Sequence, residues 1–328
     1  MNKVQRTQAD SGTFMFCRAW SGPKPGHDHE QNQDAYEVRL GHSQAGGDSV
    51  LLAISDGASS TIYAGPWARS LVAEAQLDWP SLDDETLTTK MDAARERARA
   101  AYPADLPWYI AHKLTKEGSQ ATLLVASFKR APHTDEVLIR TVAVGDSVLI
   151  VFRHDGSVAS IPVSDSADFG LSPRLISTKP QPALRFDRWA GSLELGDIAV
   201  ACTDAVGKWI LQCVESSNSK TIFRMLLDVF DEYEIPEPNM RAAGDDLFSR
   251  LSERAGLRKF AEDDVTMVLL IPIRPDKTRV PGDLARATLE AHLSGDIERV
   301  SKPRPAWLAR LTAVVRRIWR TLAGGREK

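Results

Sequence analysis

The sequence predicts an α+β fold in which β-rich layers are covered by a few helices. Two observations support this: short apolar and β-branched runs dominate the first half, and amphipathic stretches separate only some of them. Strands and helices therefore do not alternate strictly, which disfavours a doubly wound parallel sheet. The 328 residues, 43% of them hydrophobic and 26% charged, are typical of a soluble globular protein with one large or two ordinary domains.

Each expected element follows from its own local pattern. Apolar runs bounded by turn residues predict strands, and a Gly-Asp pair at 145–146 predicts a hairpin turn between two of them. Spacing close to 3.6 residues predicts helices, with Leu87, Met91, Ala94 and Ala98 forming one apolar stripe. The expected strands are 13–20, 35–40, 50–54, 121–128, 137–144, 148–153, 158–163, 198–202 and 265–273, and the expected helices are 65–77, 83–102, 221–233 and 245–260.

Three further segments complete the predicted organisation. Residues 165–188 are polar and contain proline, so we expect a long excursion near a site. We expect residues 1–275 to form one domain, residues 276–305 a polar, proline-containing linker, and residues 306–328 a basic amphipathic helix. The apolar stripe of that helix is expected to dock on the protein's own body or on a partner, or else to lie on an anionic membrane surface.

Charge and targeting signals narrow the class of protein. The net charge of −3 divides into +7 from residue 301 onward and about −10 for the remainder. An acidic body makes nucleic acid an unlikely main ligand. Three scattered cysteines predict neither a disulfide framework nor a zinc site, and the sequence has no secretory signal and no apolar run of 18 residues. We therefore expect a cytoplasmic protein, peripheral at the membrane if the C-terminal helix binds there.

Carboxylates stand at the ends of several predicted strands. Asp56 and Gly57 end the buried run at 50–54, and Asp34, Asp146, Asp204 and the pair Asp263-Asp264 occupy comparable places. Any one of them is explained equally well as a turn or helix-cap residue. Several in one domain are harder to explain that way, because a buried carboxylate is costly unless it is paired.

Convergence of these carboxylates would require a cation among them. Oxygen donors without a Cys or His pair suit the hard ions Mg²⁺, Mn²⁺ or Ca²⁺. The glycine after Asp56 lets a backbone carbonyl approach a second ion. The residues thus predict a carboxylate-bridged metal site, and a two-metal centre activates water for attack on phosphorus.

Six ordered motifs carry a family resemblance. "NQDAY", "AISDGASS", "GSQATLLVA", "AVGDSVLIV", "ACTDAVGKW" and "EDDVTMVLL" together resemble the PPM, or PP2C-like, metal-dependent serine/threonine protein phosphatases, and most closely their divergent bacterial branch. The resemblance covers roughly residues 12–273. It implies two central antiparallel sheets packed face to face with helices outside, and hydrolysis of phosphomonoesters by a water that bridges two Mn²⁺ or Mg²⁺ ions.

The resemblance also implies roles for individual residues. Asp56 would bridge both metals and Gly57 would offer its carbonyl to one, while Asp204 and Asp263 would complete the other ion's shell. Asp34 would sit behind the water or its ligands. Asp146, with Asp204, could hold a third, weaker ion.

The chain departs from the family pattern at three positions. His29, with His27 nearby, stands where many members have a phosphate-gripping arginine, and either histidine could bind phosphate when protonated or be a solvated loop residue. Ala58 replaces a histidine that donates a proton in some relatives. Asp264 replaces the usual asparagine and adds negative charge.

Three functions stay open on these grounds. The first is a phosphatase that acts on phosphoserine or phosphothreonine in proteins and opposes a bacterial kinase. The second is a pseudophosphatase that binds phosphoproteins or a regulatory partner without turnover. The third keeps the chemistry but uses a small phosphate ester as substrate.

Overall fold

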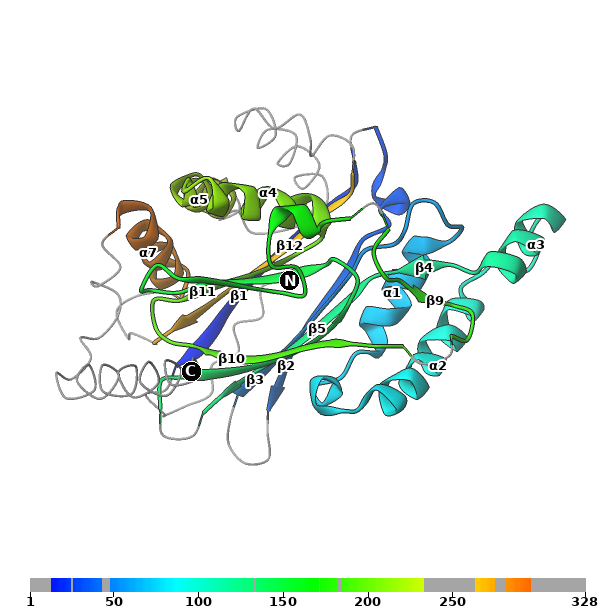
Figure 1. Ribbon diagram of the computed structural model, residues 1–328, viewed down its shortest axis with the longest axis horizontal. Helices are drawn as coiled ribbons and strands as arrows, with labels where there is room; N and C mark the ends of the chain where they lie inside the picture. The colour runs from blue at the N-terminus through cyan, green and yellow to red at the C-terminus, as the bar shows by residue number, and fades with distance from the viewer. Residues whose placement is uncertain are drawn as a thin grey trace, which may run out of the picture.

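Two five-stranded antiparallel sheets packed face to face form the centre of the molecule (Figure 1). The computed structural model describes residues 13–24, 26–42, 48–131, 134–170, 172–181, 184–232, 263–274 and 281–295. The predicted α+β class and the sandwich that the family resemblance implied are both confirmed. The expected helices at 245–260 and 306–328 lie outside the described residues.

The two sheets are built from strands distant in the sequence. One sheet has the order β1 (Phe14–Gly22), β12 (Val265–Ile273), β11 (Ile198–Cys202), β7 (Val148–Phe152), β8 (Val158–Ile161). The other has the order β10 (Asp187–Leu193), β6 (Val137–Val144), β5 (Leu123–Arg130), β3 (Asp48–Ser55), β2 (Ala35–His42). A short ladder joins β4 (Gln120–Ala121) to β9 (Ile176–Ser177).

Alternation of side chains along each strand creates three apolar layers. In β3, Val50, Leu52 and Ile54 face the space between the sheets, and Leu51 and Ala53 face outward. Each of these five side chains is at most 3% exposed. Because successive side chains point to opposite faces, a strand covered on both faces must be apolar throughout. This explains why the run reads as uninterrupted hydrophobic sequence.

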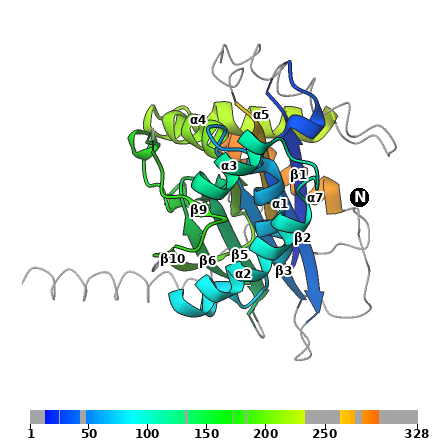
Figure 2. The same cartoon turned by 90° about the vertical axis from the view of Figure 1, so that its right-hand side faces the viewer.

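Helices cover the outer face of each sheet, as Figure 2 shows from the side. The β2–β3 sheet is covered by α1 (Ala64–Glu74) and α2 (Asp84–Ala100), and the other sheet by α4 (Asp204–Glu215), α5 (Ser219–Glu232) and α7 (Pro281–Ser294). The predicted stripe of α2 is buried, and the Asp83 side chain caps its N-terminus by accepting a bond from Thr86 N at 2.7 Å. None of the described helices is long and apolar enough to cross a membrane.

Several elements differ from the expectations. Residues 281–294, inside the expected linker, form α7, whose Ala285 and Leu289 are buried against the sandwich. The expected excursion at 165–188 holds η3 (Ser166–Asp168) and β9, and its end already belongs to β10. Besides α7, two further helices were not expected: α4, which follows β11 directly, and α3 (Trp108–Glu117), which has no buried residue. The two remaining 3-10 turns are η1 (His29–Gln31) and η2 (Trp79–Ser81).

Candidate metal centre

The carboxylates singled out in the sequence gather at one end of the sandwich. In the β2–β3 sheet, Ala35 pairs with Ser55, which places Asp34 and Asp56 side by side just beyond the ladder. In the other sheet, Cys202 pairs with both Met267 and Val148, so the segments before β12, after β11 and before β7 meet at a common end. These segments carry the remaining acidic residues, Asp146, Asp204, Asp263 and Asp264.

Hydrogen bonds tie the ends of the two sheets to each other. Thr203, which precedes Asp204 and is fully buried, donates its hydroxyl to Asp34 Oδ2 at 3.0 Å. Thr122 Oγ1 accepts a bond from the Asp56 amide at 2.9 Å and shares a 2.6 Å bond with Ser147 Oγ. The positions of Asp34 and Asp56 relative to the second sheet are therefore fixed by buried hydroxyl groups.

The carboxyl groups act on one another electrostatically. Burial raises the pKa of Asp56 well above its usual value, and the charges of Asp34, Asp204, Asp263 and Asp146 raise it further. The pKa of Asp34 is also raised well above its usual value, first by burial and then by the charge of Asp264, against hydrogen bonds that lower it. The side chains thus face one shared region in which negative charge is unfavourable.

The three carboxyl groups on the other sheet behave similarly. Burial is the largest cause for all of them and raises the pKa of Asp146, Asp204 and Asp263 to about 6. Each also feels a neighbouring carboxylate, because Asp146 acts on Asp204, Asp204 on Asp263, and Asp263 on Asp146. Bound cations would relieve this repulsion.

The donor set fits hard divalent ions. It consists of carboxylate oxygens and backbone carbonyls, the ligands that Mg²⁺ and Mn²⁺ prefer. Asp34 Oδ1 is buried without a hydrogen-bond partner, so an acceptor is available in the centre. Across the described parts of the chain, however, no three Asp, Glu, His or Cys side chains stand close enough together to hold an ion in their present positions. The metal-ligand roles of Asp56, Gly57, Asp204, Asp263 and Asp146 stay a prediction.

Gly57 stands where a side chain has no space. A Cβ atom there would lie 2.8 Å from both the Ala64 carbonyl carbon and the Gln33 oxygen, which are backbone atoms. Gly57 also bridges to Ala121, and the Asp56 carbonyl accepts a bond from Thr122 N at 2.8 Å. The chain after Asp56 is therefore held between β4 and the segment that leads into α1.

Asp264 holds the loop between β1 and β2 in place, a role that was not predicted from the sequence. Its Oδ1 accepts a bond from Lys24 N at 2.9 Å and its Oδ2 accepts one from Gln33 N at 2.8 Å. The 4% exposed side chain thus fastens both ends of the loop that joins β1 to β2. Asp264 was expected to add negative charge to the centre. Its carboxylate instead accepts hydrogen bonds from two backbone N–H groups.

The two histidines lie in the loop that Asp264 fastens. His29 is the first residue of η1, and His27 is exposed, with its backbone N donating to Lys24 O at 3.1 Å. Their assignment as phosphate ligands stays a prediction. Ala58, in place of a histidine, donates its backbone N to Gln120 O at 2.9 Å.

Sequence reasoning missed the hydroxyl groups that organise the site. Thr122, Ser147, Thr203 and Thr266 are each at most 2% exposed. Thr203 Oγ1 accepts a bond from Thr266 N at 3.1 Å in addition to its own bond to Asp34. The available signal was the placement of Thr203 and Ser147 directly beside an aspartate at the end of a buried strand.

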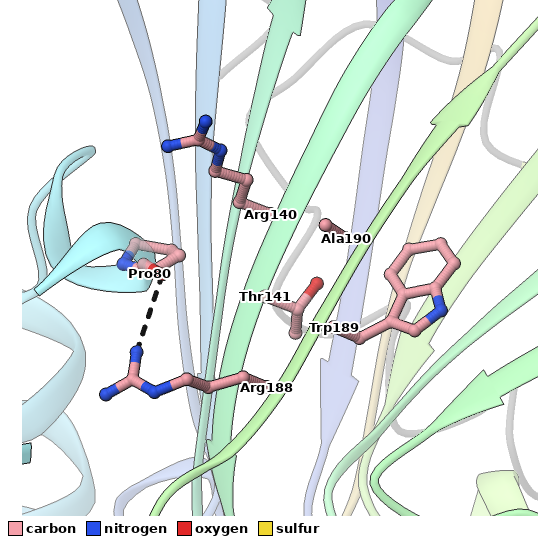
Figure 3. Close-up of a pocket in the computed structure, with 6 residues that line it drawn as sticks. All are labelled: Pro80, Arg140, Thr141, Arg188, Trp189 and Ala190. Carbon is pink, nitrogen blue, oxygen red and sulfur yellow. Dashed lines mark hydrogen bonds between the residues drawn. The ribbon is translucent and has the colours of Figure 1, made fainter. Parts of the chain in front are cut away.

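A shallow depression lies away from the carboxylates. Its volume is about 290 Å³, and Figure 3 shows Arg140 and Arg188 pointing to one side of the β6–β10 pair and Trp189 to the other. Arg188 Nη2 lies 2.5 Å from Asp84 Oδ1, and Arg140 donates to Ser81 Oγ at 2.9 Å. These arginines fasten the segment before α2 to the sheet, and the depression contains none of the predicted site residues. It is lined by Pro80, Arg140, Thr141, Arg188, Trp189 and Ala190.

Fold and site together define a four-layer αββα protein with an acidic, oxygen-donor centre at one end of its sheets. The family model described as protein phosphatase 2C matches residues 21–243, and the chain belongs to that family. The family resemblance inferred from the six motifs is thereby confirmed. None of the curated proteins compared with the chain matches it.

Solved structures similar to the chain include bacterial phosphatases. The serine/threonine phosphatase PstP/Ppp of Mycobacterium tuberculosis is 20% identical, with a TM-score of 0.44 over 78% of this chain and 98% of that one. The catalytic domain of PstP in complex with two manganese ions is 20% identical, with a TM-score of 0.42 over 80% and 99%. Stp1 from Staphylococcus aureus is 14% identical, with a TM-score of 0.45 over 82% and 99%.

Proposed function

We propose that the chain is a divalent-metal-dependent phosphatase that hydrolyses phosphoserine and phosphothreonine in proteins. The observation that carries the proposal is the convergence of aspartates from both sheets on one end of the sandwich, with mutually raised pKa values. Membership of the protein phosphatase 2C family supports the same reaction. The phosphoprotein substrate is inferred from the names of the similar structures, which are serine/threonine phosphatases.

Each residue has a definite part in this proposal. Asp56 would hold both ions and the Gly57 carbonyl one of them, Asp204 and Asp263 would complete the set of ligands around the other ion, and Asp146 would serve a weaker third ion. Bound ions supply Lewis acidity, which polarises phosphoryl oxygens and makes a water molecule acidic.

Asp34 is suited to receiving a proton. Its Oδ2 is held by Thr203, its Oδ1 has no partner, and its raised pKa makes it a stronger base than an ordinary carboxylate. We therefore assign Asp34 the role of proton acceptor and orienting group. No protein nucleophile is needed in this scheme, because phosphoryl transfer depends mainly on positioning and charge neutralisation.

A phosphothreonine peptide provides the direct test. With Mn²⁺ present, we expect release of phosphate from that peptide and little from a matched phosphotyrosine peptide. Asp56→Asn should abolish turnover, whereas Asp165→Asn, at an exposed position capping η3, should leave it unchanged. Absence of turnover with Mn²⁺, Mg²⁺ and Ca²⁺ would contradict the proposal.

Two observations favour a second candidate, a phosphoprotein-binding pseudophosphatase. The aspartates of the described residues do not form a ready ion-holding group, and His29 stands in place of the expected arginine. Calorimetric titration of ion-free protein with Mn²⁺ separates the candidates. Two or more sites that disappear in Asp56→Asn support the enzyme, and phosphopeptide binding without any Mn²⁺ site supports the binding module.

A further inference from the structure

The centre needs more positive charge than two divalent ions supply. Six aspartates face or border it, and in their ionised form they carry a charge of about −6 against +4 from two divalent ions. A phosphomonoester dianion brings two further negative charges. Protein cations at the rim would offset this excess, and two lysines stand at the appropriate places. This reasoning rests on the function proposed above.

Lys208 lies on the helix that opens at the centre. It follows Asp204 by one turn of α4 and is exposed. Its charge acts on that carboxyl group, because the Lys208 ammonium offsets part of the rise in the pKa of Asp204. Lys208 and Asp204 therefore lie on the same face of α4, at the end of the sandwich where the aspartates gather.

Lys24 stands at the rim in the loop between β1 and β2. Its backbone is fixed on both sides, since its N donates to Asp264 Oδ1 at 2.9 Å and its carbonyl accepts a bond from His27 N at 3.1 Å. Its side chain is half-buried, and its charge lowers the pKa of Asp263 against the rise caused by burial. The loop is thus anchored to the segment that carries Asp263 and Asp264, which places Lys24 at the edge of the carboxylate centre.

Two arginines near the centre are engaged elsewhere. Arg174, whose carbonyl oxygen lies beside Gly145, directs its guanidinium to Asp187 and to Arg185 O. Arg69 donates to Asn32 O at 3.3 Å from α1. The charge of Lys208, by contrast, acts on Asp204, and the charge of Lys24 acts on Asp263.

We propose that Lys24 and Lys208 bind the phosphoryl oxygens of the substrate and supply the positive charge that the sequence does not place at His29. A lysine acts as a point charge with three donors and suits a phosphate group approaching from varied angles. The two side chains approach from the β1–β2 loop and from α4. A phosphorylated side chain held between them would have its phosphorus directed at the aspartates.

Binding of a phosphothreonine peptide tests this proposal independently of turnover. We would measure the dissociation constant by calorimetry in Mg²⁺, using Asp34→Asn as the background to prevent hydrolysis. Lys24→Met and Lys208→Met, which keep the apolar stem, should each weaken binding about 10-fold, equivalent to about 1.4 kcal/mol. Lys208→Arg should restore most of the affinity. The matched control is Lys129→Met, because Lys129 is exposed and pairs with Ser49 at the opposite end of the sandwich.

A titration with Mn²⁺ distinguishes a loss of substrate binding from an effect of the lysine substitutions on the aspartates alone. If the lysines hold phosphate, the Mn²⁺ affinity of both variants stays within about twofold of the parent protein or rises. Unchanged peptide affinity in both variants, or no peptide binding by the parent protein at all, would overturn the proposal. Failure of the proposed function appears separately, as absence of turnover in the protein that retains Asp34 and both lysines.

Discussion

Thr203 and Asp34 are 169 residues apart in the sequence and are joined by a hydrogen bond of 3.0 Å in the folded protein. The threonine directly follows β11 of one sheet, and the aspartate directly precedes β2 of the other. Burial and the charge of Asp264 raise the pKa of Asp34, and the hydroxyl groups of Thr266 and Thr203 lower it. The bond from Thr203 therefore helps to hold Asp34, the proposed proton acceptor, at a fixed place and to moderate its basicity.

Replacement of Thr203 tests this bond. Thr203→Val keeps the shape but leaves Asp34 Oδ2 without its donor, so we expect a loss of about 1–3 kcal/mol in the free energy of unfolding at neutral pH. The acidic limb of the pH–rate profile should move to higher pH because the pKa of Asp34 rises. Thr203→Ser keeps the donor and serves as the control. Equal effects of the two variants on the profile would argue against the assignment.

Without bound metal ions, the protein should be more stable at mildly acidic pH than at neutral pH, which is the reverse of the usual dependence. The pKa values of Asp146, Asp204 and Asp263 are raised to about 6, so the folded protein binds protons that the unfolded chain releases near pH 4. Their charged forms destabilise the fold, and this penalty grows as pH rises through about 6. The ion-free protein should therefore show a higher Tm at pH 5 than at pH 7.5. Saturating Mn²⁺ should remove the difference, and a flat profile in EDTA would contradict the prediction.

Asp56→Asn should separate stability from metal binding. The neutral amide removes a charge that four neighbouring carboxylates oppose, so we expect a higher Tm than the parent protein in EDTA at pH 7.5. In Mn²⁺ the order should reverse, because the variant lacks the carboxylate that is proposed to hold both ions. Thermal scans in both conditions measure this. Asp155→Asn, an exposed turn position, is the control for loss of one carboxylate.

Asp264→Ala should release the loop that carries Lys24 and the two histidines. Two backbone amides, Lys24 N and Gln33 N, lose their acceptor. We expect a loss of about 2–4 kcal/mol in the free energy of unfolding, from two bonds to a charged acceptor. Hydrogen exchange should report faster exchange at both amides. Asp264→Asn keeps one acceptor oxygen, so the hydrogen-exchange rate of only one of the two amides should return toward that of the parent protein.

Gly57→Ala should disturb the chain that follows Asp56. The added Cβ meets backbone atoms of Ala64 and Gln33 at 2.8 Å, and backbone cannot move aside as a flexible side chain does. We expect a loss of about 1–3 kcal/mol in stability and a weaker Mn²⁺ affinity. Gly170→Ala is a suitable control for the glycine-to-alanine change, because its φ does not lie in the left-handed region and its Cβ would meet no atom closer than 3.9 Å. Equal losses of stability in the two variants would contradict the steric explanation.

The sequence predicted the layers of this protein better than it predicted some of its helices. Strands buried on both faces, such as the run at 50–54, leave an unambiguous apolar signal. The helix α4 was missed because it starts directly after β11 with Asp204 and contains Gly207, and it is stabilised by packing of Val206 and Ile210 against the sheet. In α7 the apolar signal is weak, since two of its buried residues are alanines.

The acidic residues of the candidate site could be predicted from the sequence, but the groups that form hydrogen bonds with them could not. An aspartate after a buried strand is conspicuous, because burial of its charge requires compensation. Thr122 and Thr266 are neutral and common in strands, so nothing in their local sequence distinguishes a site hydroxyl from a packing residue. The role of Asp264 depends on the positions of Lys24 N and Gln33 N, which only the folded chain brings together.

The turn at Asp146 links β6 of one sheet to β7 of the other, whereas Asp34 and Asp56 belong to the first sheet and Asp204 and Asp263 to the second. Under the proposed assignment, neither sheet alone carries every ligand. Affinity for ions would then be a property of the docked pair of sheets, and cleavage in any segment connecting the sheets should leave fragments that bind ions only after reassociation.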